Sequence, residues 1–178
     1  MAATDPSNNA SLALAFKAAE SLSFHLFFSF DYTTLGPWKV DDIVVLLRNY
    51  TSSPAYFRHE GNLPLVSAVE GAKNADDWVN IKKKVGGLFF VPDWASVNAE
   101  KAVKSAKGVA DGLFNVQAWP NGTADMTTDI DRRYLAALGR DQVYMMGVSP
   151  WFYTNLLNFG GTNWLWKGDG LWDLRCKS

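Results

Sequence analysis

Amphipathic segments alternate with short apolar runs along the chain. In residues 11–22 the apolar positions Leu12, Phe16 and Ala19 recur at the i, i+3, i+4 spacing of a helix, and Ser11 is a candidate N-cap. Four later segments also have the pattern of amphipathic helices. We predict helices over residues 11–22, 40–50, 75–85, 99–110 and 129–138.

Five apolar runs are short enough to be buried strands. We predict strands over residues 24–31, 63–69, 88–91, 112–118 and 143–148. Their apolar runs are nearly continuous rather than alternating, which is typical of parallel strands covered on both faces and not of hairpins. The sequence therefore predicts an α/β fold of about five parallel β/α units.

Polar or aromatic side chains end each apolar run. These residues are Asp31, Tyr32, Glu70, Asp93, Trp94, Trp119, Ser149, Trp151 and Tyr153. In a β/α barrel the C-terminal strand ends build the active site, and carboxylates with aromatic rings on one rim suit a glycosidase. The alternative is that the acids cap the following helices. Because the pattern repeats at five successive strand ends, it favours a carbohydrate cleft.

Composition narrows the classes of partner. The 178 residues suffice for one domain, and 17 basic against 18 acidic residues give a net charge of -1. This balance gives no electrostatic reason to expect nucleic acid or an anionic membrane as a partner. No apolar stretch approaches the ~18 residues of a membrane span. The N-terminal residues lack the basic and apolar leader of a signal peptide, so the localisation stays open.

Few residues are suited to a metal site or a disulfide. Cys176 is the single cysteine, and His25 and His59 are the two histidines, so we expect neither a disulfide nor a zinc site, and no cofactor. The 8 Trp, 11 Phe and 6 Tyr either fill a large core or, in part, line a sugar cleft. Trp38 and Trp78 fall on or beside predicted helices, where packing is the favoured role.

Several longer motifs carry a resemblance to a known family. They are FFSFDY (27–32), PLVSAVEG (64–71), FFVPDWAS (89–96), DGLFNVQAWP (111–120), YMMGVSPWFYTNL (144–156) and NWLWKGDGLW (163–172). In order and spacing they resemble successive blocks of glycoside hydrolase family 71, the fungal α-1,3-glucanases or mutanases. The resemblance covers about residues 5–172, so residues 1–178 are expected to form one incomplete catalytic domain.

The resemblance implies a metal-free, inverting hydrolysis of α-1,3-glucan on a (β/α)8 TIM barrel, by secreted or cell-wall enzymes. In the family a third important acid ends the FSFD strand, and that position here is Asp31. Because Tyr32, Glu70, Asp93, Trp94, Trp119, Trp151 and Tyr153 lie at or just beyond the ends of predicted strands, we expect them in the cleft that binds the polysaccharide. For Asp31 and Glu70 the role of helix cap stays open.

The departures from the family concern catalysis and closure of the barrel. The family's two principal carboxylates lie in a Trp-Asn-Asp-Tyr-Gly-Glu block, which this sequence does not contain. About five of eight strands are expected, so the sheet would keep two unpaired edges through which copies could associate. Three alternatives follow: a hydrolase, a non-catalytic glucan-binding remnant, and an inactive partial gene product.

Overall fold

The computed structural model describes residues 1–119, 125–139, 142–149, 151–154, 164–167 and 170–176. Its longer helices are α1 (Asn8–Ser21), α2 (Val40–Tyr50), α3 (Asp77–Val85), α4 (Ala99–Ala106), α5 (Asp129–Leu138) and α6 (Leu171–Cys176). Its strands are β1 (Phe28–Asp31), β2 (Arg58–His59), β3 (Leu63–Val69), β4 (Phe89–Phe90), β5 (Gly112–Asn115), β6 (Val143–Met146), β7 (Trp151–Thr154) and β8 (Trp164–Lys167). Two short 3-10 turns, Glu60–Asn62 and Ala72–Asn74, flank β3.

Parallel pairing connects the strands in the order in which the chain reaches them. Strand β1 pairs with β3 so that Asp31 lies opposite Val69, and β3 pairs in turn with β4. Strands β5 and β6 form a second parallel pair. Parallel strands place their carboxyl ends at the same edge of a sheet, so the residues that follow these strands are brought together.

Asp93 joins the two parallel groups. Just past β4 it bridges Val69 on one side and Phe114 on the other. Its N–H donates to the Ala68 carbonyl over 2.7 Å, and the N–H of Phe114 donates to the Pro92 carbonyl over 2.8 Å. Together with the hydrogen bond from the Asp111 N–H to the Phe90 carbonyl, at 2.9 Å, these contacts connect the β1–β3–β4 group to the β5–β6 group.

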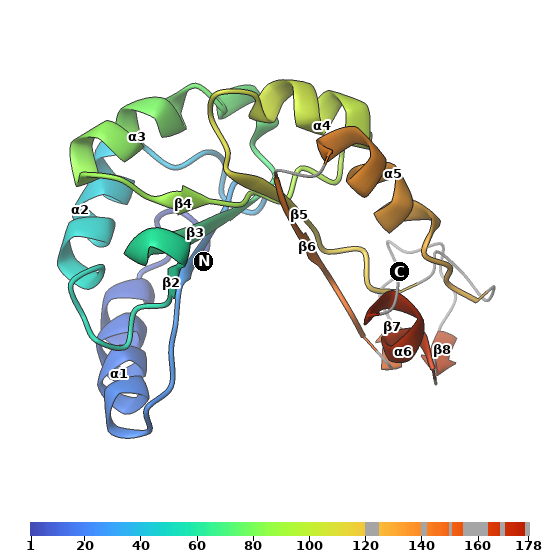
Figure 1. Cartoon of the computed structure of the whole chain (residues 1–178). Helices are drawn as coiled ribbons and strands as arrows, with labels where there is room; N and C mark the ends of the chain where they lie inside the picture. The colour runs from blue at the N-terminus through green and yellow to red at the C-terminus, as the bar shows by residue number, and fades with distance from the viewer. Residues whose placement is uncertain (120–124, 140–141, 150, 155–163, 168–169, 177–178) are drawn as a thin grey trace.

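Helices α2 to α5 follow the outer, convex side of the sheet (Figure 1). Between them and the strands lies the core, where alternate strand residues such as Phe28, Phe30, Val66 and Ala68 are at most 2% exposed. The Trp78 ring stacks on Phe90 with centroids 3.8 Å apart. Trp38 and Trp78 are buried, as their positions beside helices predict.

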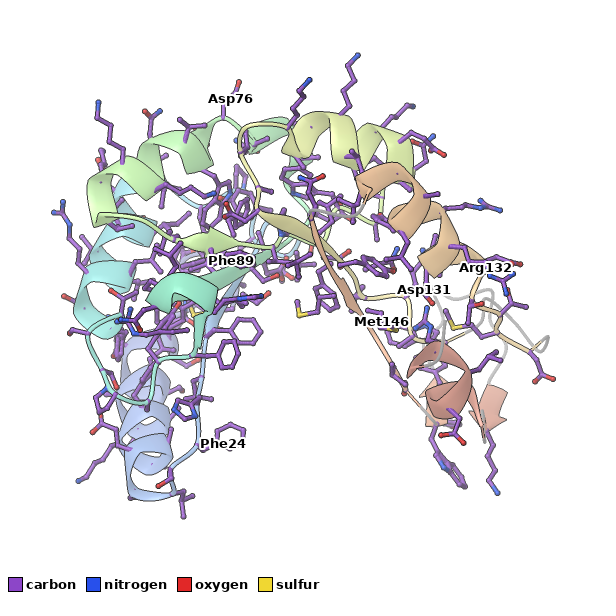
Figure 2. The ribbon with its side chains drawn as sticks, viewed as in Figure 1. Phe24, Asp76, Phe89, Asp131, Arg132 and Met146 are labelled. Atoms are coloured by element: carbon purple, nitrogen blue, oxygen red, sulfur yellow. The ribbon has the colours of Figure 1, made fainter. Side chains whose placement is uncertain are left out.

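A buried ion pair fixes α6 against α5. The guanidinium of Arg175 lies 2.8 Å from the Asp131 carboxylate, and neither side chain is exposed. The Tyr144 hydroxyl donates to the same carboxylate over 2.7 Å, and Arg175 also donates to the Gly147 carbonyl. Figure 2 shows Asp131 on α5 toward α6, while its neighbour Arg132 lies away from it.

The α/β class and the parallel pairing of the five predicted strands are confirmed. The helix predicted over 99–110 ends earlier, at Ala106, and Gly108 then has a left-handed φ of 76°. The strand predicted over 24–31 begins only at Phe28, because Leu26 pairs with the incoming segment at Tyr56. The antiparallel pairs β2–β3 and β7–β8 were not predicted from the sequence. No closed barrel is formed by the residues described.

Candidate functional site

Three carboxylates follow neighbouring parallel strands at one edge of the sheet. Asp31 ends β1, Glu70 comes directly after β3, and Asp93 comes three residues after β4. The backbone joins them, because Val69 lies opposite Asp31 and also pairs with Asp93. We call Asp31, Glu70 and Asp93 the rim carboxylates.

The Asp31 carboxylate closes a tight turn. Its Oδ1 accepts hydrogen bonds from the N–H and the hydroxyl of Thr33, at 2.7 and 2.6 Å, and from the N–H of Thr34 at 3.3 Å. The Thr34 hydroxyl donates to Oδ2. Partial burial raises the pKa of the Asp31 carboxyl, but these hydrogen bonds outweigh it and bring the pKa to about 2. The group is therefore an ionised acceptor, and it caps a turn rather than the helix α2, which begins at Val40.

Glu70 is held in an unfavourable backbone conformation. Its φ is 60°, in the left-handed region, and that of the next residue, Gly71, is 87°. A side chain in this region is sterically disfavoured and persists where surrounding contacts hold it. The carboxylate accepts a 2.8 Å hydrogen bond from the N–H of Ser96 and another from the Ser96 hydroxyl. The backbone N–H of Glu70 donates to the Asp93 carbonyl over 2.7 Å.

The Asp93 carboxyl is buried beneath this edge, with 1% of the residue exposed. Burial, and then the charge of Glu70, raise its pKa from 3.8 to about 6, against the lowering effect of backbone hydrogen bonds from Val116 and Ala95. Asp31 and Asp93 thus differ in protonation around pH 5, although both follow parallel strands. Carboxyl groups whose surroundings separate their pKa values are typical of functional sites.

Two of the predicted sugar-binding aromatics lie inside the protein. The Trp94 side chain is 1% exposed and approaches Phe90 edge-on at 6.3 Å. Tyr32 is 8% exposed and packs over Gly71, and burial followed by the charge of Asp77 raises the pKa of its hydroxyl. Neither ring has an open face for a pyranose in this structure.

The other predicted aromatics lie on or against the hairpin of β7 and β8. Trp151 and Tyr153 are 55% and 61% exposed, and as alternate residues of β7 they share one face. The Lys167 ammonium lies 5.3 Å from the centre of the Trp151 ring. On the other face of β7, Phe152 stacks on Trp119 with centroids 4.5 Å apart and planes 6° from parallel. The hairpin therefore presents two open aromatic faces.

The comparison with known proteins identifies the family of the chain. A sequence model described as glycosyl hydrolase family 71 matches residues 1–178. The chain belongs to glycosyl hydrolase family 71. The match extends beyond the residues 5–172 that the motifs indicate.

Two curated relatives carry glucanase names. One, "Glucan endo-1,3-alpha-glucosidase agn1" of Schizosaccharomyces pombe, is 31% identical over 172 residues, which cover 88% of this chain and 39% of that protein. The other, "Mutanase Pc12g07500" of Penicillium rubens, is 31% identical over 170 residues, which cover 92% of this chain and 36% of that protein. This family 71 chain therefore spans less than two fifths of the length of either relative.

Sequence reasoning missed the partners that hold the rim carboxylates of this family 71 chain. Thr33 and Thr34 follow Asp31 at the spacing of an Asx turn, a signal that could have been used. Ser96 donates a hydrogen bond to Glu70, which lies 26 residues earlier in the chain, and no local sequence pattern predicts that contact. The family motif FFVPDWAS does contain Ser96, but a motif does not say which side chain it binds.

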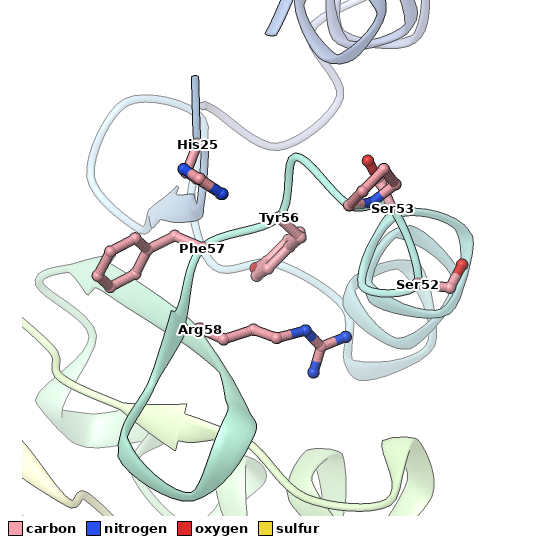
Figure 3. A pocket seen from close by; sticks show the side chains of 7 residues that line it. His25, Ser52, Ser53, Tyr56, Phe57 and Arg58 are labelled. Carbon is pink, nitrogen blue, oxygen red and sulfur yellow. The ribbon is translucent and has the colours of Figure 1, made fainter. Parts of the chain in front are cut away.

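A hollow of about 380 Å³ lies at the opposite end of the strands (Figure 3). It is lined by His25, Ser52, Ser53, Pro54, Tyr56, Phe57 and Arg58. The Arg58 guanidinium donates to the carbonyls of Asn62 and Thr51, so its charge closes a loop. The active sites of β/α barrels lie at the C-terminal strand ends. The rim carboxylates, which lie at those ends, are therefore the stronger candidate site.

Neither a metal site nor a membrane span is found in the described part of the chain. Within it, no three His, Cys, Asp or Glu side chains gather so that they could hold a metal ion. No described helix combines the length and the apolar character needed to cross a bilayer. The rim carboxylates can form hydrogen bonds to hydroxyls and exchange protons, and the exposed rings of Trp151 and Tyr153 on the hairpin can stack on flat partners.

Proposed function

We propose that this chain supplies part of the α-1,3-glucan-binding cleft of a family 71 glucanase, and that its β/α units are about five of the eight of a (β/α)8 barrel. The observation that carries the proposal is the position of Asp31, Glu70 and Asp93 at one edge of a parallel sheet whose strands follow chain order. A barrel places its active site at that edge. Family membership and the glucosidase name of a relative support the choice of substrate.

Each rim residue has a role in this proposal. Asp31, ionised above about pH 2, accepts hydrogen bonds from sugar hydroxyls and is the residue nearest to catalysis. Glu70 adds a second acceptor, and Asp93 supports it from below through the backbone contact between them. Trp151 and Tyr153 stack on pyranose faces, with Trp119 holding their strand through Phe152. Trp94 and Tyr32 shape the cleft from beneath rather than by stacking.

Hydrolysis with inversion needs more than these groups. It requires a general acid and a general base on opposite faces of the sugar, with carboxyl groups about 6.5–9.5 Å apart. The family's principal pair lies in a block that this sequence does not contain. We therefore expect the chain by itself to bind glucan without turnover, while the complete enzyme hydrolyses it at the fungal cell wall or outside the cell.

The test measures binding and turnover on one sample. Purified chain is incubated with insoluble α-1,3-glucan, the bound fraction and the released reducing sugar are measured, and circular dichroism follows thermal unfolding. We expect a folded chain that binds glucan, releases no sugar, and binds more weakly after Trp151→Ala or Tyr153→Ala. Phe24→Ala is the matched control, because Phe24 is 61% exposed and precedes β1 at the opposite end of the strands.

The other results identify the alternatives. If glucan binding is unchanged after both aromatic substitutions, the proposed glucan-binding cleft is contradicted. Sugar release that Asp31→Asn abolishes would place a catalytic centre within this chain, in contrast to binding alone. A chain without a cooperative melt would be the inactive partial product. The same proposal includes association of copies of the chain through the sheet edges.

A further inference from the structure

The sequence contains three Asn-x-Ser/Thr sequons that the glucan-binding proposal does not use. They begin at Asn9, Asn49 and Asn121. Such a triplet accepts an N-linked glycan when it lies on the surface of a secreted protein. Asn121 lies outside the residues that the structure describes. The structure can therefore distinguish between Asn9 and Asn49.

Asn49 lies on the surface, one residue before the end of α2. Within the described part of the chain its side-chain amide makes no hydrogen bond. The middle residue of the sequon, Tyr50, faces the core instead, where its ring lies 4.7 Å from that of Phe16. A glycan on Asn49 would therefore extend into solvent without displacing a packed side chain or breaking a hydrogen bond.

The chain leaves the helical conformation directly after this sequon. Thr51 is the C-cap of α2, and Ser52, Ser53 and Pro54 follow it. Proline has no N–H and disfavours the helical conformation of the residue before it, so this segment resists helix formation in the unfolded chain as well. The transferase acts on the chain before it folds and takes a sequon in an extended or turn conformation. The Asn49 sequon is next to a segment that favours such a conformation.

The Asn9 sequon is less suitable, although Asn9 is also exposed. It lies wholly within α1, a segment rich in Ala and Leu, which are strong helix formers. The Ser11 N–H already donates to the Ser7 carbonyl over 3.0 Å at the start of this helix. Residues two positions apart do not face each other on a helix, so the Asn9 amide and the Ser11 hydroxyl are kept apart wherever α1 forms.

Asn49 also lies at the end of the strands opposite the rim carboxylates. The Thr51 carbonyl accepts a hydrogen bond from Arg58, and Arg58 pairs with Pro64 near the start of β3. The residues that follow Thr51 line the hollow at this end (Figure 3). A glycan on Asn49 would therefore leave the proposed glucan cleft open.

We propose that Asn49 is an N-glycosylation site. This inference rests on the proposed function in one respect, because that function places the complete enzyme at the cell wall or outside the cell. In the transfer, Nδ2 of Asn49 forms a bond to C1 of the reducing-end sugar of a lipid-diphosphate-linked oligosaccharide. The bond between C1 and the phosphate oxygen breaks, the lipid diphosphate leaves, and the amide loses one proton to solvent. The Thr51 hydroxyl completes the acceptor sequon.

The test locates the modification by mass. The full chain is expressed in a eukaryotic host behind a secretion leader, and both secreted and retained protein are digested, because transfer precedes folding. A peptide N-glycosidase releases the glycan and converts the asparagine that carried it to aspartate, which peptide mass spectrometry locates. We expect the glycan at Asn49. An unmodified Asn49, or a glycan only at Asn9 or Asn121, would overturn the inference.

Two substitutions at Thr51 separate the sequon from the fold. Thr51→Val has nearly the same shape without the hydroxyl and should abolish the glycan at Asn49, whereas Thr51→Ser should retain it. A glycan that persists at Asn49 in Thr51→Val would contradict the assignment. Binding to insoluble α-1,3-glucan is measured on the same protein before and after glycan release, and we expect it to be unchanged. A chain that carries the glycan at Asn49 but binds no glucan would support this inference and contradict the proposed cleft.

Discussion

At the scale of single residues, the rim depends on backbone conformations that its sequence only partly reveals. The turn after Asp31 follows from local chemistry, since a carboxylate followed by two threonines can accept their N–H and hydroxyl groups. The turn at Glu70 does not, because the non-glycine residue adopts the left-handed conformation and Ser96, distant in sequence, holds it. The sequence therefore predicted that these carboxylates follow the strands, but it did not predict the contacts that hold them.

Gly71 makes the Glu70 turn possible for two reasons that can be separated. Its φ is 87°, and a Cβ at this position would lie 2.8 Å from the Tyr32 ring. Gly86 has nearly the same φ, 84°, with nothing within 4 Å of a Cβ. Both alanine variants incur the left-handed cost of about 1–2 kcal/mol. Gly71→Ala should cost roughly 1–3 kcal/mol more because of the clash. Urea unfolding of both variants measures the difference, and equal losses would mean that Tyr32 moves aside freely.

The pH dependence of stability should identify Asp93. Its pKa in the folded chain, about 6, is above its ordinary value of 3.8, so the folded state holds this proton more tightly than the unfolded state. The stabilisation by this bound proton is complete below about pH 4 and is lost as the pH rises toward 6. Between the two pKa values the free energy of unfolding falls by ~1.4 kcal/mol for each pH unit. Asp93→Asn cannot ionise, so the fall between pH 4 and 6 should be smaller in this variant. Chemical unfolding from pH 3 to 7 measures it.

Asp31 gives the opposite sign and serves as the control. Its pKa of about 2 is below 3.8, so the stability that it contributes is present above pH 4 and is lost as the pH falls toward 2. Asp31→Asn should therefore lower stability at pH 5 and have little effect at pH 2. If Asp93→Asn reproduced the profile of the unmodified chain between pH 4 and 6, the raised pKa of Asp93 would be contradicted.

At the scale of elements, the sequence predicts what local periodicity determines. The bounds of α2, α5 and β3 agree with the sequence prediction, because each has an apolar pattern of the right length for its element. The hairpin of β7 and β8 was not predicted: its pairing depends on two segments separated by nine residues and has no two-residue turn signal. The ion pair of Asp131 with Arg175 joins α6 to α5, and no periodicity in the sequence predicts that contact.

That ion pair should be essential for the attachment of α6. Removing one member of a buried pair leaves an uncompensated charge and costs about 3–5 kcal/mol, so Arg175→Met should destabilise the chain strongly. Asp131→Asn combined with Arg175→Met removes both charges and keeps an acceptor for Tyr144, and it should recover part of the loss. The exposed pair Arg132–Asp129 is the control, and Arg132→Ala should cost at most about 1 kcal/mol. Thermal melts of the four proteins compare them, and equal losses for Arg175→Met and Arg132→Ala would mean that α6 is not held by this pair.

At the scale of the whole molecule, the parallel sheet has helices on its convex side, and the described residues do not cover the other side in the same way (Figure 1). Since Phe28 and Phe30 point into the core under the helices, Phe27 points to the other side, and it is 40% exposed. The Phe57 ring, also 40% exposed, lies 6.2 Å from it. The sequence predicted open sheet edges, but an aromatic cluster on the inner face required the three-dimensional arrangement of β1 and the segment before β2.

This inner face and the sheet edges should lead copies of the chain to associate. Met1 and Ala2 already pair with part of the edge of β1, so the exposed apolar cluster is the stronger reason for contact with another chain, because such a contact removes apolar surface from water. Sedimentation velocity over a range of concentrations should show a species larger than the monomer that grows with concentration. Phe57→Lys places a charge on the cluster and should shift the chain toward monomer, whereas Leu135→Lys, at a position that is 40% exposed on α5, should not. A chain that sediments as a monomer at every concentration would show that the inner face is tolerated in water, and the case for association would then fail.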